Sequence, residues 1–165
     1  MQKILEKHFE YFVVSGYVSI LFGRSRATED IDVLVKEINK KKFSEFWKEI
    51  NKSFWCLSAK TLEEALEVLK ESSLRFAKKN EIIPNIKLKT CKKRIDFLTM
   101  DEKIKVILAN KKSIFIPPIE LQIAYKEEVL KSEKDLEDAF YLRELFKERI
   151  DNRKIEEFKK VIKSG

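Results

Sequence analysis

The chain has 165 residues, of which 38% are charged and 44% hydrophobic, and its formal net charge is +7. One histidine and two isolated cysteines argue against histidine-based triads, cysteine-pair zinc sites and a disulfide framework. The uncharged run 11–23 is shorter than the ~20 residues that cross a bilayer, and the residues before it mix lysine with glutamate. We therefore expect no membrane helix and no secretory signal, and a reducing, cytoplasmic setting.

The first part of the chain predicts a strand, a tight turn and a short helix. Residues 11–14 are rich in β-forming side chains, Ser15 and Gly16 form the turn, and residues 17–22 fit a buried helix that ends at Gly23. At such a junction the backbone N–H groups point outward, and a residue without a side chain lets phosphate oxygens approach closely. Ser15 and Gly16 are therefore candidates for phosphate binding, although most Ser-Gly pairs are only turns.

Two closely spaced carboxylates follow on the next predicted strand, residues 30–35. Side chains alternate along a strand, so Asp30 and Asp32 share one face. Two like charges side by side repel each other unless protons or cations neutralise them, and a divalent ion such as Mg²⁺ or Mn²⁺ held by carboxylate oxygens is the usual remedy. The structural alternative is that Asp30 ends a turn and Asp32 faces water.

The order of a small-residue turn, a short helix and Asp-x-Asp resembles the nucleotidyltransferase superfamily that includes DNA polymerase beta. The matching turn is Ser15-Gly16, because Gly23 lies only seven residues before Asp30 and leaves no room for the helix. Ser15 stands where the family usually has its first glycine. The arginines between the turn and the carboxylates, Arg24 and Arg26, are placed to contact a nucleoside triphosphate, or else to pair with Glu29.

The resemblance also implies a third carboxylate on a later strand, and Asp96 in the run 94–99 is the candidate. Asp30, Asp32 and Asp96 would then hold two divalent ions for an in-line phosphoryl displacement, with Asp96 helping to deprotonate the acceptor. The structural alternative for Asp96 is a strand-end aspartate held by backbone amides.

The middle of the chain predicts two helices and a basic hairpin. Residues 40–50 and 61–71 are amphipathic, and the aromatic stripe of the first helix is expected to pack in the core. Short β-leaning segments follow at 74–77, 86–88 and 95–98. An excess of basic side chains here suits a polyanionic acceptor such as RNA or, equally, a solvated hairpin face: Lys78, Lys79, Lys87, Lys89, Lys92, Lys93 and Arg94.

The C-terminal part predicts helices at 116–131, from 132 onward, and at 151–163. Lys126 falls on the apolar stripe of the first of these helices, where a lysine either snorkels to the edge or reaches a buried anion. We expect that anion to be the triphosphate. The lysine-bearing helix followed by Lys134-Asp135-x-x-Asp138 is similar to nucleotidyltransferases related to abortive-infection toxins, whereas the alternative is a solvated helix start.

Together these segments predict an α+β fold, with a small mixed β-sheet nucleotidyltransferase core flanked by helices and a C-terminal helical segment. We expect one domain over residues 1–165, with an α/β core at 1–100 and a mostly helical part at 101–165. The first functional hypothesis is a Mg²⁺- or Mn²⁺-dependent transfer of a nucleoside monophosphate from a nucleoside triphosphate to an acceptor hydroxyl, for example on RNA. The second keeps the fold without the chemistry, as an RNA- or protein-binding module such as one half of a toxin and antitoxin pair.

Overall fold

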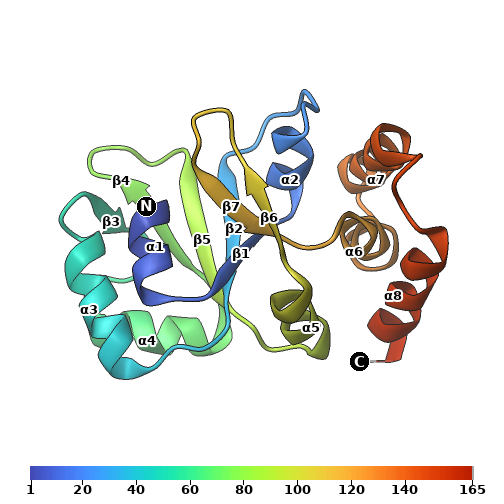
Figure 1. The fold of residues 1–165 in the computed structure, drawn as a ribbon. Coiled ribbons are helices and arrows are strands. Elements are labelled where there is room, and N and C mark those ends of the chain that lie inside the picture. Colours follow the sequence, from blue (N-terminus) through green and yellow to red (C-terminus); the bar gives the residue numbers. More distant parts are fainter. Residues whose placement is uncertain (165) are drawn as a thin grey trace.

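A computed structural model describes residues 1–164 and shows a mixed β-sheet followed by a group of packed helices (Figure 1). The elements in chain order are α1 (Gln2–His8), β1 (Tyr11–Val14), α2 (Gly16–Leu21), β2 (Asp30–Val35), α3 (Lys40–Ile50), β3 (Phe54–Cys56), α4 (Leu62–Glu71), β4 (Leu74–Lys78), β5 (Asn85–Thr90), α5 (Arg94–Glu102), β6 (Ile104–Ile107), β7 (Ser113–Ile116), α6 (Ile119–Tyr125), the π-helical turn η1 (Lys126–Leu130), α7 (Glu133–Phe146) and α8 (Asn152–Ser164).

Five strands form the sheet in the order β1-β2-β5-β4-β3. The central pair, β2 and β5, is parallel, and the other neighbours are antiparallel. Strands β6 and β7 form a separate hairpin, and β7 contacts β1. The predicted α+β class with a small mixed sheet is therefore confirmed.

One face of the sheet forms the main core. Alternate side chains of β2 and β4, among them Val33, Val35 and Phe76, are buried there. They pack with the aromatic stripe of α3, whose Phe43 and Phe46 are fully buried. The prediction that these aromatic residues belong to the core is thus confirmed, and their apolar contacts fix the orientation of β2.

The opposite face of the sheet is apolar at one end and charged at the other. Phe12 of β1 and Leu34 of β2 lie side by side, and they pack with Met100 of α5 and Phe115 of β7. Asp30 and Asp32 occupy the same face of β2, toward its N-terminal end. The buried face therefore anchors β2 while the aspartates remain outside the core.

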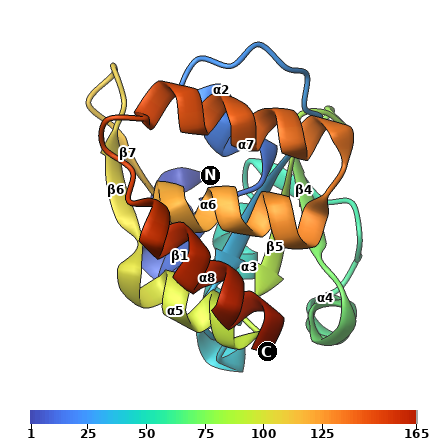
Figure 2. The ribbon, with the colours of Figure 1, turned by 90° about the vertical axis from the view of Figure 1, so that its right-hand side faces the viewer.

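The C-terminal helices pack on one another beside the sheet. Helix α6 packs against both α7 and α8, and α7 also contacts α2 (Figure 2). The helix predicted over 116–131 begins only at Ile119, because Ile116 ends strand β7 and Pro118 is the N-cap. Its final segment, 126–130, adopts the wider π geometry of η1 and is followed by Lys131 in a left-handed conformation (φ 54°). Within residues 1–164, no helix has both the length and the apolar character needed to cross a bilayer.

One predicted element is of the wrong type, and three short strands were not predicted. The run 95–98 lies in α5 and not in a strand, because Asp96 at the third helical position accepts hydrogen bonds from the backbone and caps the helix start. Strands β3, β6 and β7 were not predicted. All three are short, and the side chains of β3 and β6 are exposed or only partly buried, whereas β7 has two buried side chains, Ile114 and Ile116. Helix α5 also crosses the expected internal boundary at residue 100.

Candidate functional site

The aspartates of β2 each form an ion pair with a lysine of the neighbouring strand β5. The Lys89 ammonium lies 2.8 Å from Asp32, and Lys87 pairs with Asp30. The pairs form because β2 and β5 run parallel with Asp32 beside Lys87, which puts all four side chains on one face of the sheet. The two negative charges are therefore balanced by two positive charges. Among the described residues, no group of three histidine, cysteine, aspartate or glutamate side chains is placed to hold a metal ion.

The predicted phosphate turn lies at the end of β1, next to the aspartate strand. Val14 pairs with Asp32 in the sheet, and Ser15 follows directly. Ser15 has φ 68° and ψ −150°, a backbone conformation that glycine adopts readily and other residues rarely do. This geometry gives a physical reason for a glycine at this place in the superfamily pattern. Strain of this kind is often found at ligand-binding turns.

Gly16 begins α2 and lies under the guanidinium group of Arg26. A Cβ atom added at Gly16 would lie about 2.5 Å from Nη1 of Arg26, which is closer than real Cβ contacts. The absence of a side chain at Gly16 therefore makes room for the arginine. The structure thus brings together three of the predicted nucleotide-binding residues, Ser15, Gly16 and Arg26.

A buried charge network joins the segment after α2 to the C-terminal helices. Asp138 of α7 is fully buried and pairs with Arg24, Arg26 and Lys126. The Lys126 ammonium, also fully buried, lies 2.7 Å from Asp138 and 3.3 Å from Asp135. The buried anion that Lys126 reaches is therefore a protein carboxylate and not the expected triphosphate, and the arginines pair with α7 and not with Glu29. The interpretation of Asp138 as part of a solvated helix start is wrong.

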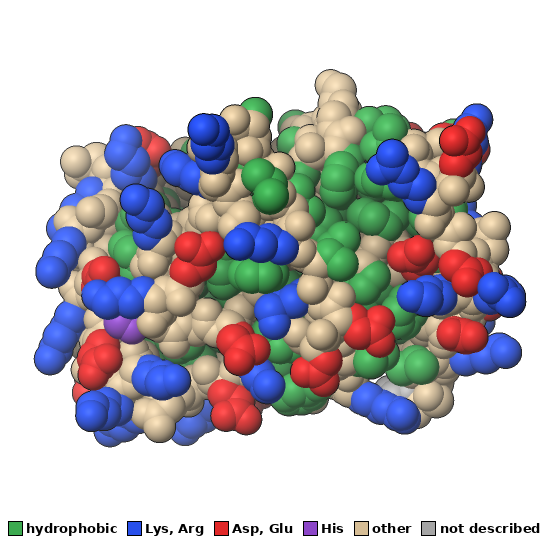
Figure 3. Space-filling view, in the orientation of Figure 1, with side chains coloured by type: hydrophobic (Ala, Val, Ile, Leu, Met, Phe, Trp, Pro, Cys, Tyr) green, Lys and Arg blue, Asp and Glu red, His purple; other side chains and the backbone are tan. Residues whose placement is uncertain are grey.

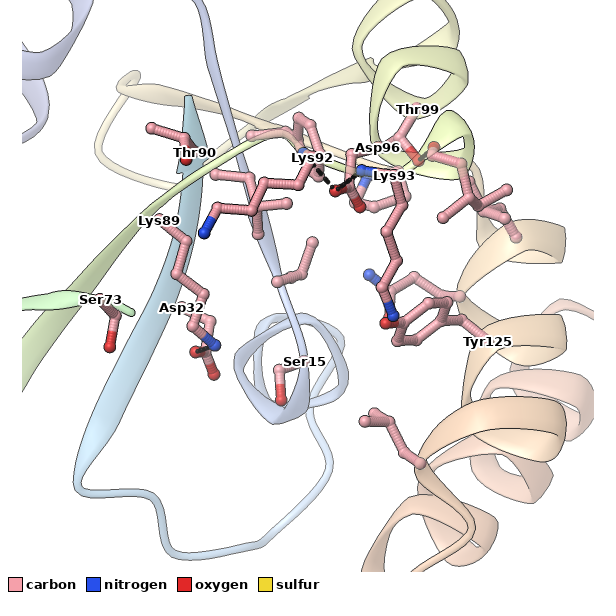
Figure 4. A pocket seen from close by; sticks show the side chains of 18 of the residues that line it. Ser15, Asp32, Ser73, Lys89, Thr90, Lys92, Lys93, Asp96, Thr99 and Tyr125 are labelled. Carbon is pink, nitrogen blue, oxygen red and sulfur yellow. Dashed lines mark hydrogen bonds and ion pairs between the residues drawn. The ribbon is translucent and has the colours of Figure 1, made fainter. Parts of the chain in front are cut away.

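Asp96 is held by backbone amides at the start of α5. Its Oδ2 accepts hydrogen bonds from the N–H groups of Lys92 and Lys93, both at 2.9 Å. This is the structural alternative considered for Asp96, on a helix in place of a strand. Asp96 still faces the same cavity as Asp32, from the opposite side (Figure 4).

The cavity has a volume of about 460 Å³ and lies between the sheet, α5 and the α6–η1 segment. Figure 4 shows Asp32, Lys89 and Ser15 on one side of this space and Tyr125 of α6 on the other. Apolar side chains form much of the wall: Phe12, Val14, Leu34, Ile95, Pro117, Leu121 and Leu130. A mostly apolar hollow of this size with a few polar groups is typical of a small-molecule site.

Burial changes the pKa of two side chains in this region, Tyr125 in the cavity wall and Cys91 in the apolar cluster with Phe12. Burial, together with the Asp96 carboxylate, raises the pKa of the Tyr125 phenol, which therefore keeps its proton at neutral pH. Burial also raises the pKa of the Cys91 thiol to about 12, with a contribution from Asp96. We infer that Cys91, which lies in the apolar cluster and not in the cavity wall, is not a reactive thiol.

The basic region that was expected to face a polyanion is partly neutralised by acidic groups. Lys87 and Lys89 are occupied by the aspartates of β2, and Lys78 pairs with Glu81. On the face shown in Figure 3, lysine and arginine side chains are interspersed with aspartate and glutamate. Lys89, Lys92 and Lys93 all line the cavity.

Sequence reasoning missed the role of Lys87 and Lys89 as partners of the aspartates. The spacing of the two lysines, two residues apart in one strand, shows only that they share a face, and the strand register that brings them to the aspartates is not visible in the sequence. It also missed Tyr125, which no motif marks.

No family model matches the sequence, and no curated protein matches it. The fold is similar to the solution structure of the antibiotic-resistance factor ANT(2'')-Ia, a protein with substrate-regulated conformation dynamics, with a TM-score of 0.56 at 12% sequence identity. The match covers 99% of this chain and 89% of that chain. At this identity the likeness shows the fold alone, and the mixed sheet with its helices is consistent with the nucleotidyltransferase fold expected from the sequence.

Proposed function

We propose that this chain is a nucleotidyltransferase, which transfers a nucleoside monophosphate from a nucleoside triphosphate to an acceptor hydroxyl and releases pyrophosphate. The observation that carries the proposal is the pair Asp30 and Asp32 on one face of β2, with Asp32 open to a cavity beside the Ser15 turn. The fold alone supports many functions, so the proposal depends on these side chains.

The donor atoms at this place fit Mg²⁺ or Mn²⁺. Magnesium usually takes one or two protein carboxylates and completes its coordination with water and substrate phosphates. Asp30 and Asp32 supply that number of carboxylates and would hold the ion. When bound, such an ion neutralises charge that develops on the phosphoryl oxygens.

The remaining residues would bind and orient the two substrates. The Ser15 hydroxyl can donate a hydrogen bond to a phosphate oxygen, and Arg26 lies over Gly16, where it can add positive charge. Both hydrogen bonds to Asp96 fall on Oδ2, which leaves Oδ1 available to accept the proton of the acceptor hydroxyl. Arg24 and Lys126 would act as positioning residues through the buried network.

RNA is the acceptor class that we propose. The net charge of +7 favours a polyanion, and three lysines lie at the cavity wall. A salt-sensitive interaction with RNA would follow from this charge.

The test is transfer of label from each of four α-labelled nucleoside triphosphates in the presence of Mg²⁺ or Mn²⁺, with total RNA or cell extract as acceptor. The variant Asp30→Asn/Asp32→Asn should lose at least about 100-fold in rate, because a bound ion supplies several kcal/mol of transition-state stabilisation. Asp101→Asn, at an exposed position of α5, is the matched control. Equal transfer by the double variant and the wild type would refute the proposal.

A binding module without catalysis is the second candidate function. Two observations support it. Both aspartates pair with lysines, and Ser15 stands where the superfamily pattern usually has its first glycine. It predicts salt-sensitive binding of RNA, or of a protein partner such as an antitoxin, that survives Asp30→Ala and Asp32→Ala. Transfer of label by the wild type alone would exclude it.

A further inference from the structure

Lys87 and Lys89 lean the same way along β5. In the sheet Lys87 lies beside Asp32, and Lys89 lies beside Leu34. Each ammonium group nevertheless pairs with the aspartate two residues nearer the start of β2, so that Lys87 contacts Asp30 and Lys89 contacts Asp32. Both carboxylates of the proposed metal site are thus covered by protein cations, in positions where a divalent ion would also bind.

These two ion pairs are partly exposed to solvent, unlike the pair of Asp138 with Lys126, in which both side chains are fully buried. The exposed fraction of the side chain is 44% for Lys89 and 22% for Lys87, against 13% for Asp32 and 27% for Asp30. Partly exposed pairs contribute little net free energy, so they can separate at low cost. A lysine is also long and flexible enough to move its charge without any change in the backbone.

The balance of charge decides what can occupy the site. Two carboxylates and two ammonium groups sum to zero, so a divalent ion that bound alone would leave two uncompensated positive charges beside the lysines. A polyphosphate that arrives with the ion gives those ammonium groups a new partner. Lys89 lines the cavity together with Lys92 and Lys93, so the released ammonium would lie at the wall that the phosphates face.

From this arrangement we infer that Lys87 and Lys89 couple metal binding to nucleotide binding: they compete with the divalent ion for Asp30 and Asp32, and they bind the polyphosphate once displaced. The inference rests on the proposed function. It assigns the lysines opposite effects on the two ligands, weakening the binding of the metal alone and strengthening the binding of the metal–polyphosphate complex.

Two binding measurements test this inference without any catalytic assay. Electron paramagnetic resonance measures the affinity for Mn²⁺ alone, and calorimetry measures the affinity for inorganic triphosphate in excess Mg²⁺. Lys89→Gln and Lys87→Gln should each bind Mn²⁺ about fivefold more tightly than the wild type and Mg²⁺-triphosphate about fivefold less tightly. Lys79→Gln, an exposed lysine after β4, removes the same charge and should change neither affinity by more than about twofold.

The charge-preserving variant Lys89→Arg keeps the result interpretable if a glutamine variant folds poorly, and it should bind Mn²⁺ as weakly as the wild type. The inference would be overturned if both glutamine variants bound Mn²⁺ no more tightly than the wild type while Asp30→Asn/Asp32→Asn lost Mn²⁺ binding. That result would leave the proposed function intact. If Asp30→Asn/Asp32→Asn still bound both Mn²⁺ and Mg²⁺-triphosphate, the proposed metal site itself would be refuted.

Discussion

The carboxylate of Asp138 is expected to be the costliest single charge to remove from this fold. It is fully buried and pairs with Lys126, also fully buried, as well as with Arg24 and Arg26. In Asp138→Asn the lysine would retain only Asp135, at 3.3 Å. Removing one partner of a buried pair typically costs about 3–5 kcal/mol, and because Asp135 remains we expect about 3–4 kcal/mol of unfolding free energy. For a chain of this size that is a decrease of roughly 6 to 16 °C in Tm.

Urea and thermal unfolding followed by circular dichroism measure this loss. Lys126→Met should cost less than Asp138→Asn, since Asp138 would keep two arginines whereas Lys126 keeps one distant carboxylate. Glu137→Gln removes an exposed partner of Arg24 and should change the unfolding free energy by at most about 1 kcal/mol. If Asp138→Asn were as stable as Glu137→Gln, the network would not hold α7 to the segment after α2.

Three further predictions concern backbone strain, acid stability and thiol reactivity. Ser15→Gly should raise the free energy of unfolding by about 1 kcal/mol, since glycine adopts the φ 68° conformation without strain, whereas Ser15→Ala should give no such gain in thermal unfolding. Although burial raises the pKa of Glu127, hydrogen bonds from Arg143 and Lys159 lower it more, so its folded-state pKa lies below the ordinary 4.5. The stability that Glu127 contributes through Arg143 and Lys159 is therefore present above pH ~4.5 and lost as the pH falls further. In Glu127→Gln the free energy of unfolding should fall less steeply with decreasing pH in this acidic range. Cys91, whose thiol pKa is about 12 because of burial, should resist alkylation at pH 8 in the native protein and react in urea, as peptide mapping by mass spectrometry would show.

Local signals in the sequence predicted those elements whose side-chain pattern and caps agree with their tertiary surroundings. The helix 40–50 has the expected bounds, and the predicted helix 61–71 begins with a capping box formed by Thr61 and Glu64. The strand that carries the aspartates was also predicted correctly. In each case the buried face matches the period of one element type, so local preference and packing agree.

The run 94–99 shows where a local signal is ambiguous. Ile95 and Thr99 are spaced for a helix face, while the alternation around Asp96 also fits a short strand. The run forms helix α5 because Asp96 caps its start and because the helix buries Ile95 and Thr99. Hairpin β6–β7 escaped prediction for a different reason, since its strands depend on pairing with each other and on the contact of β7 with β1.

The charge partners in the candidate site could not be read from the sequence, because each depends on a contact between distant segments. Arg24 and Asp138 are 114 residues apart, and Lys89 and Asp32 are 57 apart. Composition indicated an excess of lysine near Asp96, but only the register of β5 against β2 shows that two of these lysines face the aspartates. This register changes the chemical meaning of the Asp-x-Asp motif. In place of a bare acidic pair that must find a cation, the fold presents a neutral cluster in which a metal ion would have to replace a lysine. Under our inference these carboxylates would bind a metal ion more tightly when another ligand gives the displaced ammonium groups a new partner, and a polyphosphate is such a ligand.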